Sequence, residues 1–185
     1  MKKFLLIVLI WVGVIKLWTI LWNYYSADLK YVKSQNYLSK RDTQMAKVLI
    51  DQAIQKNPQE PNYYRGKAKI LIVSDVNNRD AILVQFKKAE ELNPENLVTL
   101  RNLIPLYYFL LAPEASVGAV YDEKYLSIVK DFYKRVKENY AHDAGVVSAV
   151  ARYEKKLGFK TEYRESVEII RKLRPDLLDW YESFR

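Results

Sequence analysis

Few residues of this 185-residue chain could perform covalent or acid–base chemistry. It contains no cysteine, which excludes thiolate nucleophiles, disulfides and cysteine-ligated metals. The single histidine, His142, precedes Asp143 at a predicted turn between helices, where a polar cap is the ordinary explanation. The carboxylates of Glu90 and Glu91 are predicted to lie on an exposed helix face, where adjacent side chains diverge. With no Gly-rich phosphate loop, GxSxG or HExxH motif either, we expect no enzyme, no cofactor and no metal.

Polar residues at helical spacing favour binding instead. Arg65 and Lys69 are four residues apart and share a helix face, which indicates either a solvated surface or a basic binding pair. With other Asn, Gln and Tyr residues they could hold an extended peptide through its backbone amides and acidic groups. The candidate contacts lie opposite the apolar faces of four predicted helices: Tyr31, Gln35, Asn62, Arg65, Lys69, Thr99, Leu103, Tyr107, Ser148, Arg152 and Lys155.

The formal net charge of +8 raises the question of nucleic acid or anionic lipid as a partner. Acidic residues are interspersed with the basic ones almost throughout the chain. An excess of positive charge that is not clustered indicates a solvated surface, so we do not expect nucleic-acid binding. The expected partner is a protein or peptide.

The elements that must position these residues form a repeat. Three segments end in the same way, at Pro58, Pro94 and Pro175. Apolar or small residues precede each proline by 12, 8 and 5 positions, which places them on one helical face: Ala46, Ile50 and Ala53; Ile82, Phe86 and Ala89; Tyr163, Val167 and Ile170. The helix at 125–140 has Val129, Tyr133 and Val136 in the same phase.

This pattern resembles the second helix of the tetratricopeptide repeat (TPR), and the block PNYYRGKAKIL resembles its first helix. The resemblance implies an all-α, right-handed solenoid of helical hairpins over 26–175, with units at about 27–60, 61–94, 95–141 and 143–175. Pro105 should kink the third unit, and the stretch 112–119 should form a loop. A helix at 176–185 should cap the stack with Leu177, Leu178 and Trp180.

Some TPR proteins clamp the terminal carboxylate of a partner with a set of basic and Asn residues. The matching positions here hold Val32, Gly66 and Leu100, so no such clamp is expected.

The N-terminal segment 1–25 is apolar, with one charge, Lys16, between Phe4 and Trp22. A helix over 4–22 would be about 28 Å long, close to the thickness of the bilayer core. It predicts a transmembrane anchor of a single-pass protein in the bacterial cytoplasmic membrane, N-terminus inside and repeats outside. The rival interpretation is a cleaved signal peptide, although the small residues of a cleavage site are missing.

A second resemblance is narrower. SADLKY, KNPQEPNYYRG, NLVTLRNLIPLYYFLLA and LRPDLLDWYE, in this order after an apolar helix, are similar to the region that follows the last membrane helix of bacterial O-antigen ligases and polysaccharide polymerases. This chain lacks their catalytic part. The predicted function is a membrane-anchored scaffold for protein interaction in cell-envelope assembly. The alternative is an accessory or detached part of such a ligase, with other membrane proteins of glycan assembly as partners.

Overall fold

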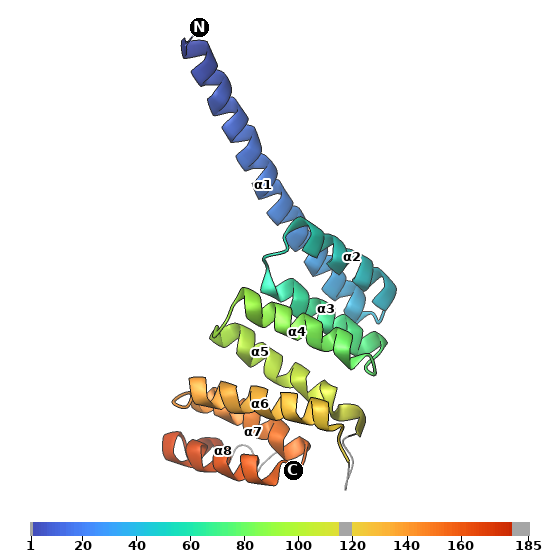
Figure 1. The fold of residues 1–185 in the computed structure, drawn as a ribbon, viewed down its shortest axis with the longest axis vertical. Coiled ribbons are helices and arrows are strands. Elements are labelled where there is room, and N and C mark those ends of the chain that lie inside the picture. The colour runs from blue at the N-terminus through green and yellow to red at the C-terminus, as the bar shows by residue number, and fades with distance from the viewer. Residues whose placement is uncertain (1, 115–119, 179–185) are drawn as a thin grey trace.

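The computed structural model of the chain is an all-α stack of helices (Figure 1). It describes the backbone of residues 2–114 and 120–178, and the side chains of these residues except 2, 3 and 5–8. The α-helices are α1 (Lys2–Ser39), α2 (Thr43–Lys56), α3 (Pro61–Ser74), α4 (Arg79–Leu92), α5 (Leu97–Tyr107), α6 (Glu123–Asn139), α7 (Ala144–Lys156) and α8 (Lys160–Leu173).

The apolar residues that recur before the prolines form much of the core. Those of α2, α4 and α6 are fully buried. In α8, Ile170 is buried, whereas Tyr163 and Val167 are half-buried because α8 lies at the end of the described stack. Helix α2 packs on the C-terminal half of α1, α4 on α3, and α8 on α7. The helical repeat is therefore confirmed, while the exact limits of its four units stay a prediction.

Short polar side chains fix where the helices begin. The carboxylates of Asp42, Asp122 and Asp143 and the amide of Asn96 each accept a hydrogen bond from a backbone N–H of the first helical turn. Asp143 is thus the helix cap that the sequence predicts. Gly158, with φ of 71°, makes the turn between α7 and α8 in the left-handed conformation that glycine adopts without strain.

Pro105 lies inside α5 rather than ending it at once. The α-helix continues to Tyr107 and then tightens into two 3₁₀ turns, η1 (Tyr108–Leu110) and η2 (Ala112–Glu114). Proline has no N–H to donate and crowds the preceding turn, so the regular ladder is weakened here. The buried hydroxyl of Tyr133 donates to the carbonyl of Ile104, 3.2 Å away, next to this weak point.

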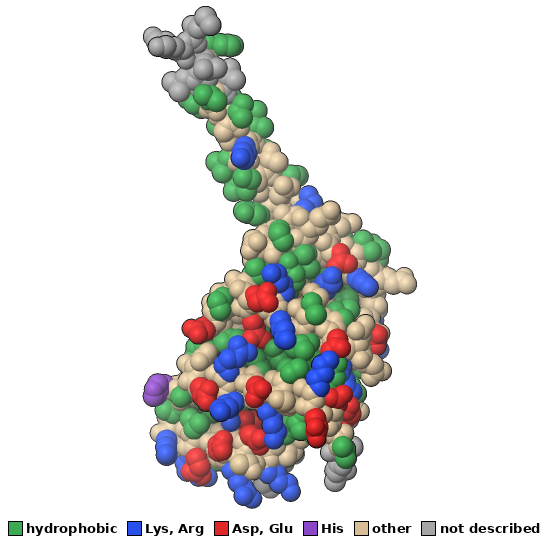
Figure 2. Space-filling model, viewed as in Figure 1, with side chains coloured by type: hydrophobic (Ala, Val, Ile, Leu, Met, Phe, Trp, Pro, Cys, Tyr) green, Lys and Arg blue, Asp and Glu red, His purple; other side chains and the backbone are tan. Residues whose placement is uncertain are grey.

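The N-terminal half of α1 projects beyond the stack and exposes apolar side chains (Figures 1 and 2). In the described stretch from Leu9 onward, Lys16, Thr19 and Asn23 interrupt the apolar run. No helix within the described residues is long and apolar enough to cross a membrane. This finding contradicts the predicted transmembrane helix 4–22 and the single-pass membrane localisation. Helix α1 also continues without a break through 25–27, where the sequence suggested a domain boundary.

The end of the stack is described only to residue 178. Leu177 and Leu178 pack against a small cluster formed by Val147, Ala151 and Ile170, as expected of capping residues. The rest of the predicted capping helix, including Trp180, lies outside the described residues, as does most of the predicted 112–119 loop.

Candidate functional site

The first helices of the hairpins form a continuous layer. We use this term for α1 from Ala27 onward, α3, α5 and α7. Helix α3 contacts both α1 and α5, and α5 contacts α7. Among the described residues, none of the second helices α2, α4, α6 and α8 is in comparable contact with another second helix. The first helices therefore form one connected layer along the stack.

The structure brings together four of the predicted contact residues on α1 and α3. A Cβ atom added to Gly66 would lie 2.8 Å from Cε2 of Tyr31 and 3.0 Å from Nε2 of Gln35. The two helices are therefore in close contact at Gly66, next to Arg65, and Lys69 follows one turn later. The ring of Tyr31 packs against the buried Tyr63, with centroids 5.3 Å apart.

Two polar atoms of this cluster are buried and have no hydrogen-bond partner among the described residues. Nε of Arg65 and Nε2 of Gln35 are inaccessible to water, and neither has a hydrogen-bond partner among the described residues. An unsatisfied buried polar atom costs about 1–3 kcal/mol. Partial burial lowers the pKa of Lys69 below its usual value, and the nearby charge of Arg65 lowers it further.

Asn62 lies one turn before Arg65 on the same face of α3 and is half-buried. Tyr63 and Tyr64, the two residues between Asn62 and Arg65, are both engaged within the protein. The hydroxyl of Tyr63 donates to Asp28 at 2.5 Å, and that of Tyr64 donates to the carbonyl of Pro58 at 3.0 Å. Burial and this carboxylate raise the pKa of Tyr63 above its usual range.

In α5 the structure places the predicted contacts in the core. Thr99, Leu103 and Tyr107 are all buried. The ring of Tyr107 stacks on Phe132 at 3.8 Å, and its hydroxyl donates to Glu90 at 2.6 Å. Burial, followed by the charge of Glu90, raises the pKa of Tyr107 far above its usual value. Ligand contact by these residues stays a prediction, and their burial places them away from an open surface.

The helix caps give a better alignment of the units. Asn62, Arg65 and Lys69 lie two, five and nine positions after the cap residue Glu60 of α3. The same positions after Asn96 of α5 are Val98, Arg101 and Pro105. Of these, Val98 and Arg101 are exposed and Pro105 is half-buried. Counting from the cap Asn96 would have found this face from the sequence.

In α7 the same positions after Asp143 hold Gly145, Ser148 and Arg152. Arg152 is exposed, as is Lys155, whose ammonium lies over the ring of Tyr163. Ser148 is buried and its Oγ has no hydrogen-bond partner among the described residues. We call the face formed by these positions on α3, α5 and α7, together with Tyr31 and Gln35 of α1, the first-helix surface.

Charge is distributed unevenly between the two sets of helices. The basic residues of the first helices are Lys30, Lys33, Arg65, Lys67, Lys69, Arg101, Arg152, Lys155 and Lys156, and their acidic residues are Asp28 and Glu154 alone. The second helices carry many residues of both signs, with more basic than acidic ones, and their acidic residues are Asp51, Asp80, Glu90, Glu91, Glu123, Asp131, Glu138, Glu162, Glu165 and Glu168. Acidic and basic side chains are interspersed on the face of the body that Figure 2 shows.

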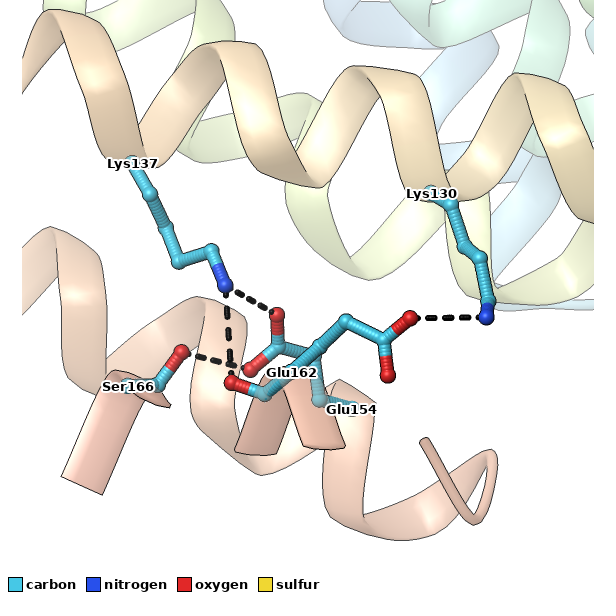
Figure 3. A network of polar contacts seen from close by, with 5 residues as sticks. All are labelled: Lys130, Lys137, Glu154, Glu162 and Ser166. Atoms are coloured by element: carbon cyan, nitrogen blue, oxygen red, sulfur yellow. Dashed lines mark hydrogen bonds and ion pairs between the residues drawn. The ribbon is translucent and has the colours of Figure 1, made fainter. Parts of the chain in front are cut away.

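A second group of charges lies between α6, α7 and α8 (Figure 3). The ammonium of Lys137 is 2.8 Å from Glu154, whose side chain is only 1% exposed. The hydroxyl of Ser166 donates to the other oxygen of Glu154 at 2.6 Å, and Lys130 pairs with Glu162 at 2.7 Å. A pocket of about 490 Å³ opens beside these residues. Because its innermost charges are already paired, this group is explained by structure alone.

Glu90 differs from its predicted role as an exposed carboxylate. Its side chain is only 12% exposed and accepts hydrogen bonds from Tyr107 and from Arg135, the latter at 2.5 Å. It therefore ties α4 to α5 and α6. His142 is exposed at the turn before α7. In the described part of the chain, no group of His, Asp and Glu residues is arranged to hold a metal ion.

Comparison with known proteins supports the fold. No family model matches the sequence, and no curated protein matches it significantly. A solved structure that does match is a thermophilic TPR protein of Thermus thermophilus, TTC0263, with a TM-score of 0.54 and 16% sequence identity. The match covers 80% of this chain and 75% of that one. No comparison supports the likeness to O-antigen ligases or a role in the cell envelope. The chain is an all-α helical repeat whose fold resembles a TPR solenoid.

Proposed function

We propose that the chain is a scaffold that binds an extended segment of a partner protein on the first-helix surface. The fold it resembles is that of a non-enzymatic repeat scaffold, and such folds generally bind protein or peptide partners. The observation that carries the proposal is the cluster of Arg65 and Gln35. Their buried polar atoms have no partner among the described residues and lie in the continuous layer of first helices.

The residue types on this surface suit a peptide backbone. The side-chain amides of Gln35 and Asn62 can donate to and accept from main-chain groups, and Arg65 can form two parallel hydrogen bonds to one acceptor. Gly66 allows α1 and α3 to approach closely, which places Gln35 against α3 at the residue that follows Arg65. The absence of a catalytic constellation in the sequence agrees with a binding role, and lack of enzymatic activity stays a prediction.

The test is site-specific photocrosslinking in cells that produce the full chain. Val98 on α5 and Val84 on α4 form a matched pair, because both are valines and their exposed fractions are 62% and 59%. Each is replaced in turn by a photoreactive phenylalanine analogue. A protein crosslinked at position 98 and absent at position 84 supports the proposal. Equal crosslinking at both positions, or crosslinking at 84 alone, contradicts it.

A further inference from the structure

We infer that the partner segment bound by the first-helix surface is acidic, and that Arg65 and Lys69 together anchor one of its carboxylates. The inference rests on the proposed function and adds the chemistry of the partner. It follows from two neighbouring, half-buried cations on α3, Arg65 and Lys69, which have no counter-ion among the described residues.

The first helices have no carboxylate to spare. Asp28 accepts a hydrogen bond from the hydroxyl of Tyr63, and Glu154 is buried with Lys137 and Ser166. Within residues 2–114 and 120–178, Arg65, Lys69, Arg101 and Arg152 form no ion pair within 4.0 Å. The first-helix surface thus carries a row of basic side chains without internal counter-ions.

Lys67 shows that this is a property of the face and not of α3 as a whole. It lies between Arg65 and Lys69 in the sequence but points to the second helix α2, where it pairs with Asp51 at 2.7 Å. The basic residue that faces a second helix therefore has a counter-ion. Its two neighbours on the first-helix surface have none among the described residues.

Burial makes the Arg65–Lys69 pair the strongest candidate anchor. Both side chains are half-buried, and Nε of Arg65 is fully covered. Two positive charges held close together in a partly buried site repel each other. The loss of hydration further raises the free energy of their charged forms. A carboxylate placed between them would offset both effects.

An acidic peptide fits this surface better than a nucleic acid. Single-stranded nucleic acids need free aromatic faces on which bases stack. Three aromatic rings of the first helices are occupied within the protein: Tyr31 packs on Tyr63, Tyr107 stacks on Phe132, and Tyr153 lies beside Tyr108 and under Lys156. Tyr37, near the end of α1, is exposed, but a single ring does not provide a row on which successive bases stack. The surface offers cations and amides, which suit carboxylates and a peptide main chain.

The experiment selects random dodecapeptides by display on the full chain and measures the affinity of enriched peptides by fluorescence anisotropy. We expect the enriched peptides to have more Asp and Glu than the starting library. Replacing these residues by Asn and Gln should weaken binding by about tenfold or more. The double variant Arg65→Glu/Lys69→Glu should weaken binding by a similar factor. Arg65→Gln/Lys69→Gln provides a milder version should charge reversal disturb the fold, which circular dichroism would reveal.

The matched control is Lys160→Glu/Arg164→Glu on α8. These two basic residues are also four positions apart, exposed, and without an ion pair among the described residues. This variant should retain affinity within about twofold, as expected for exposed charges. Enrichment of neutral or basic peptides, or equal loss in both variants, overturns the acidic-partner inference and leaves the proposed function standing. Enrichment of no peptide overturns both. Displacement of bound peptide by a short single-stranded oligonucleotide that binds more tightly through Arg65 and Lys69 also overturns the inference.

Discussion

Lys137 and Lys69 are both shielded from solvent, but only Lys137 has a counter-ion among the described residues. Lys137, between α6 and α7, is 10% exposed and is matched by Glu154, which is itself hydrogen-bonded to Ser166. Lys69, on the first-helix surface, is half-buried beside Arg65 and has no carboxylate within reach among the described residues. The buried Lys137 thus has its counter-ion within the protein. We propose that a carboxylate of the partner supplies the counter-ion that the half-buried Lys69 lacks among the described residues.

The largest effect is expected when one member of the buried pair Lys137 and Glu154 is removed. Lys137→Met leaves Glu154 charged and buried without its partner, and should lower the free energy of unfolding by about 3–5 kcal/mol. The double variant Lys137→Met/Glu154→Leu should recover most of this loss, because the uncompensated charge is gone. Urea denaturation measures both. A single variant as stable as wild type would show that the pair does not stabilise the fold.

A substitution at Tyr107 tests whether a buried residue of a first helix contributes to stability and not to peptide binding. Tyr107→Phe removes the hydroxyl that donates to Glu90 and should cost about 1.5–3 kcal/mol, as hydrogen bonds to charged groups do. Peptide affinity should not change, because the ring lies in the core. Weakened affinity with unchanged stability would instead restore Tyr107 to the ligand contacts predicted from the sequence.

Gly66 tests the close contact that holds the cluster together. In Gly66→Leu the new side chain would displace Tyr31 and Gln35, so stability should fall by about 1–3 kcal/mol and peptide affinity should fall with it. Gly66→Ala is the milder control. Its clash involves the ends of two long side chains, and the better helix propensity of alanine offsets it by about 1 kcal/mol. Thermal denaturation and anisotropy on the same samples separate the two effects.

Removing Lys69 should have the smallest effect on stability. Lys69→Met should be within about 0.5 kcal/mol of wild type or slightly more stable, because the charge is unpaired and half-exposed. The lowered pKa gives a sign to the pH dependence. The charged form of Lys69 is disfavoured in the folded state, so its penalty is present in full below the folded pKa and disappears as the pH rises towards 10.5. Any stability that Lys69→Met gains over wild type should therefore decrease as the pH rises from the folded pKa of Lys69 towards 10.5. A marked loss of stability at neutral pH would reveal a partner for Lys69 within the protein.

The sequence predicted the second helices well because their pattern is local. Apolar residues 12, 8 and 5 positions before a proline specify one buried face and its end, and residues such as Ile50 and Phe86 are fully buried. The contacts predicted on α5 lie at buried positions, because Pro105 and the irregular third unit obscured the helical phase in the sequence. The cap at Asn96 carried the missing signal. The partners Lys137 and Glu154 are 17 positions apart on different helices, and no local pattern joins them.

Prediction of a membrane anchor depended on hydropathy alone and is contradicted within the described residues. The domain boundary near residue 26 stays a prediction, and α1 passes through it without a break. No Pro or Gly interrupts the chain between Gly13 and Ser39, so nothing ends the helix, and α1 runs on into the stack.

The most direct measurement is the titration of the Lys69 side chain by NMR, in the free protein and with an enriched acidic peptide bound. The account predicts a pKa below 10.5 in the free protein and an upward shift on binding, because the peptide carboxylate offsets the burial and the charge of Arg65. A pKa that does not rise when the acidic peptide binds would contradict it.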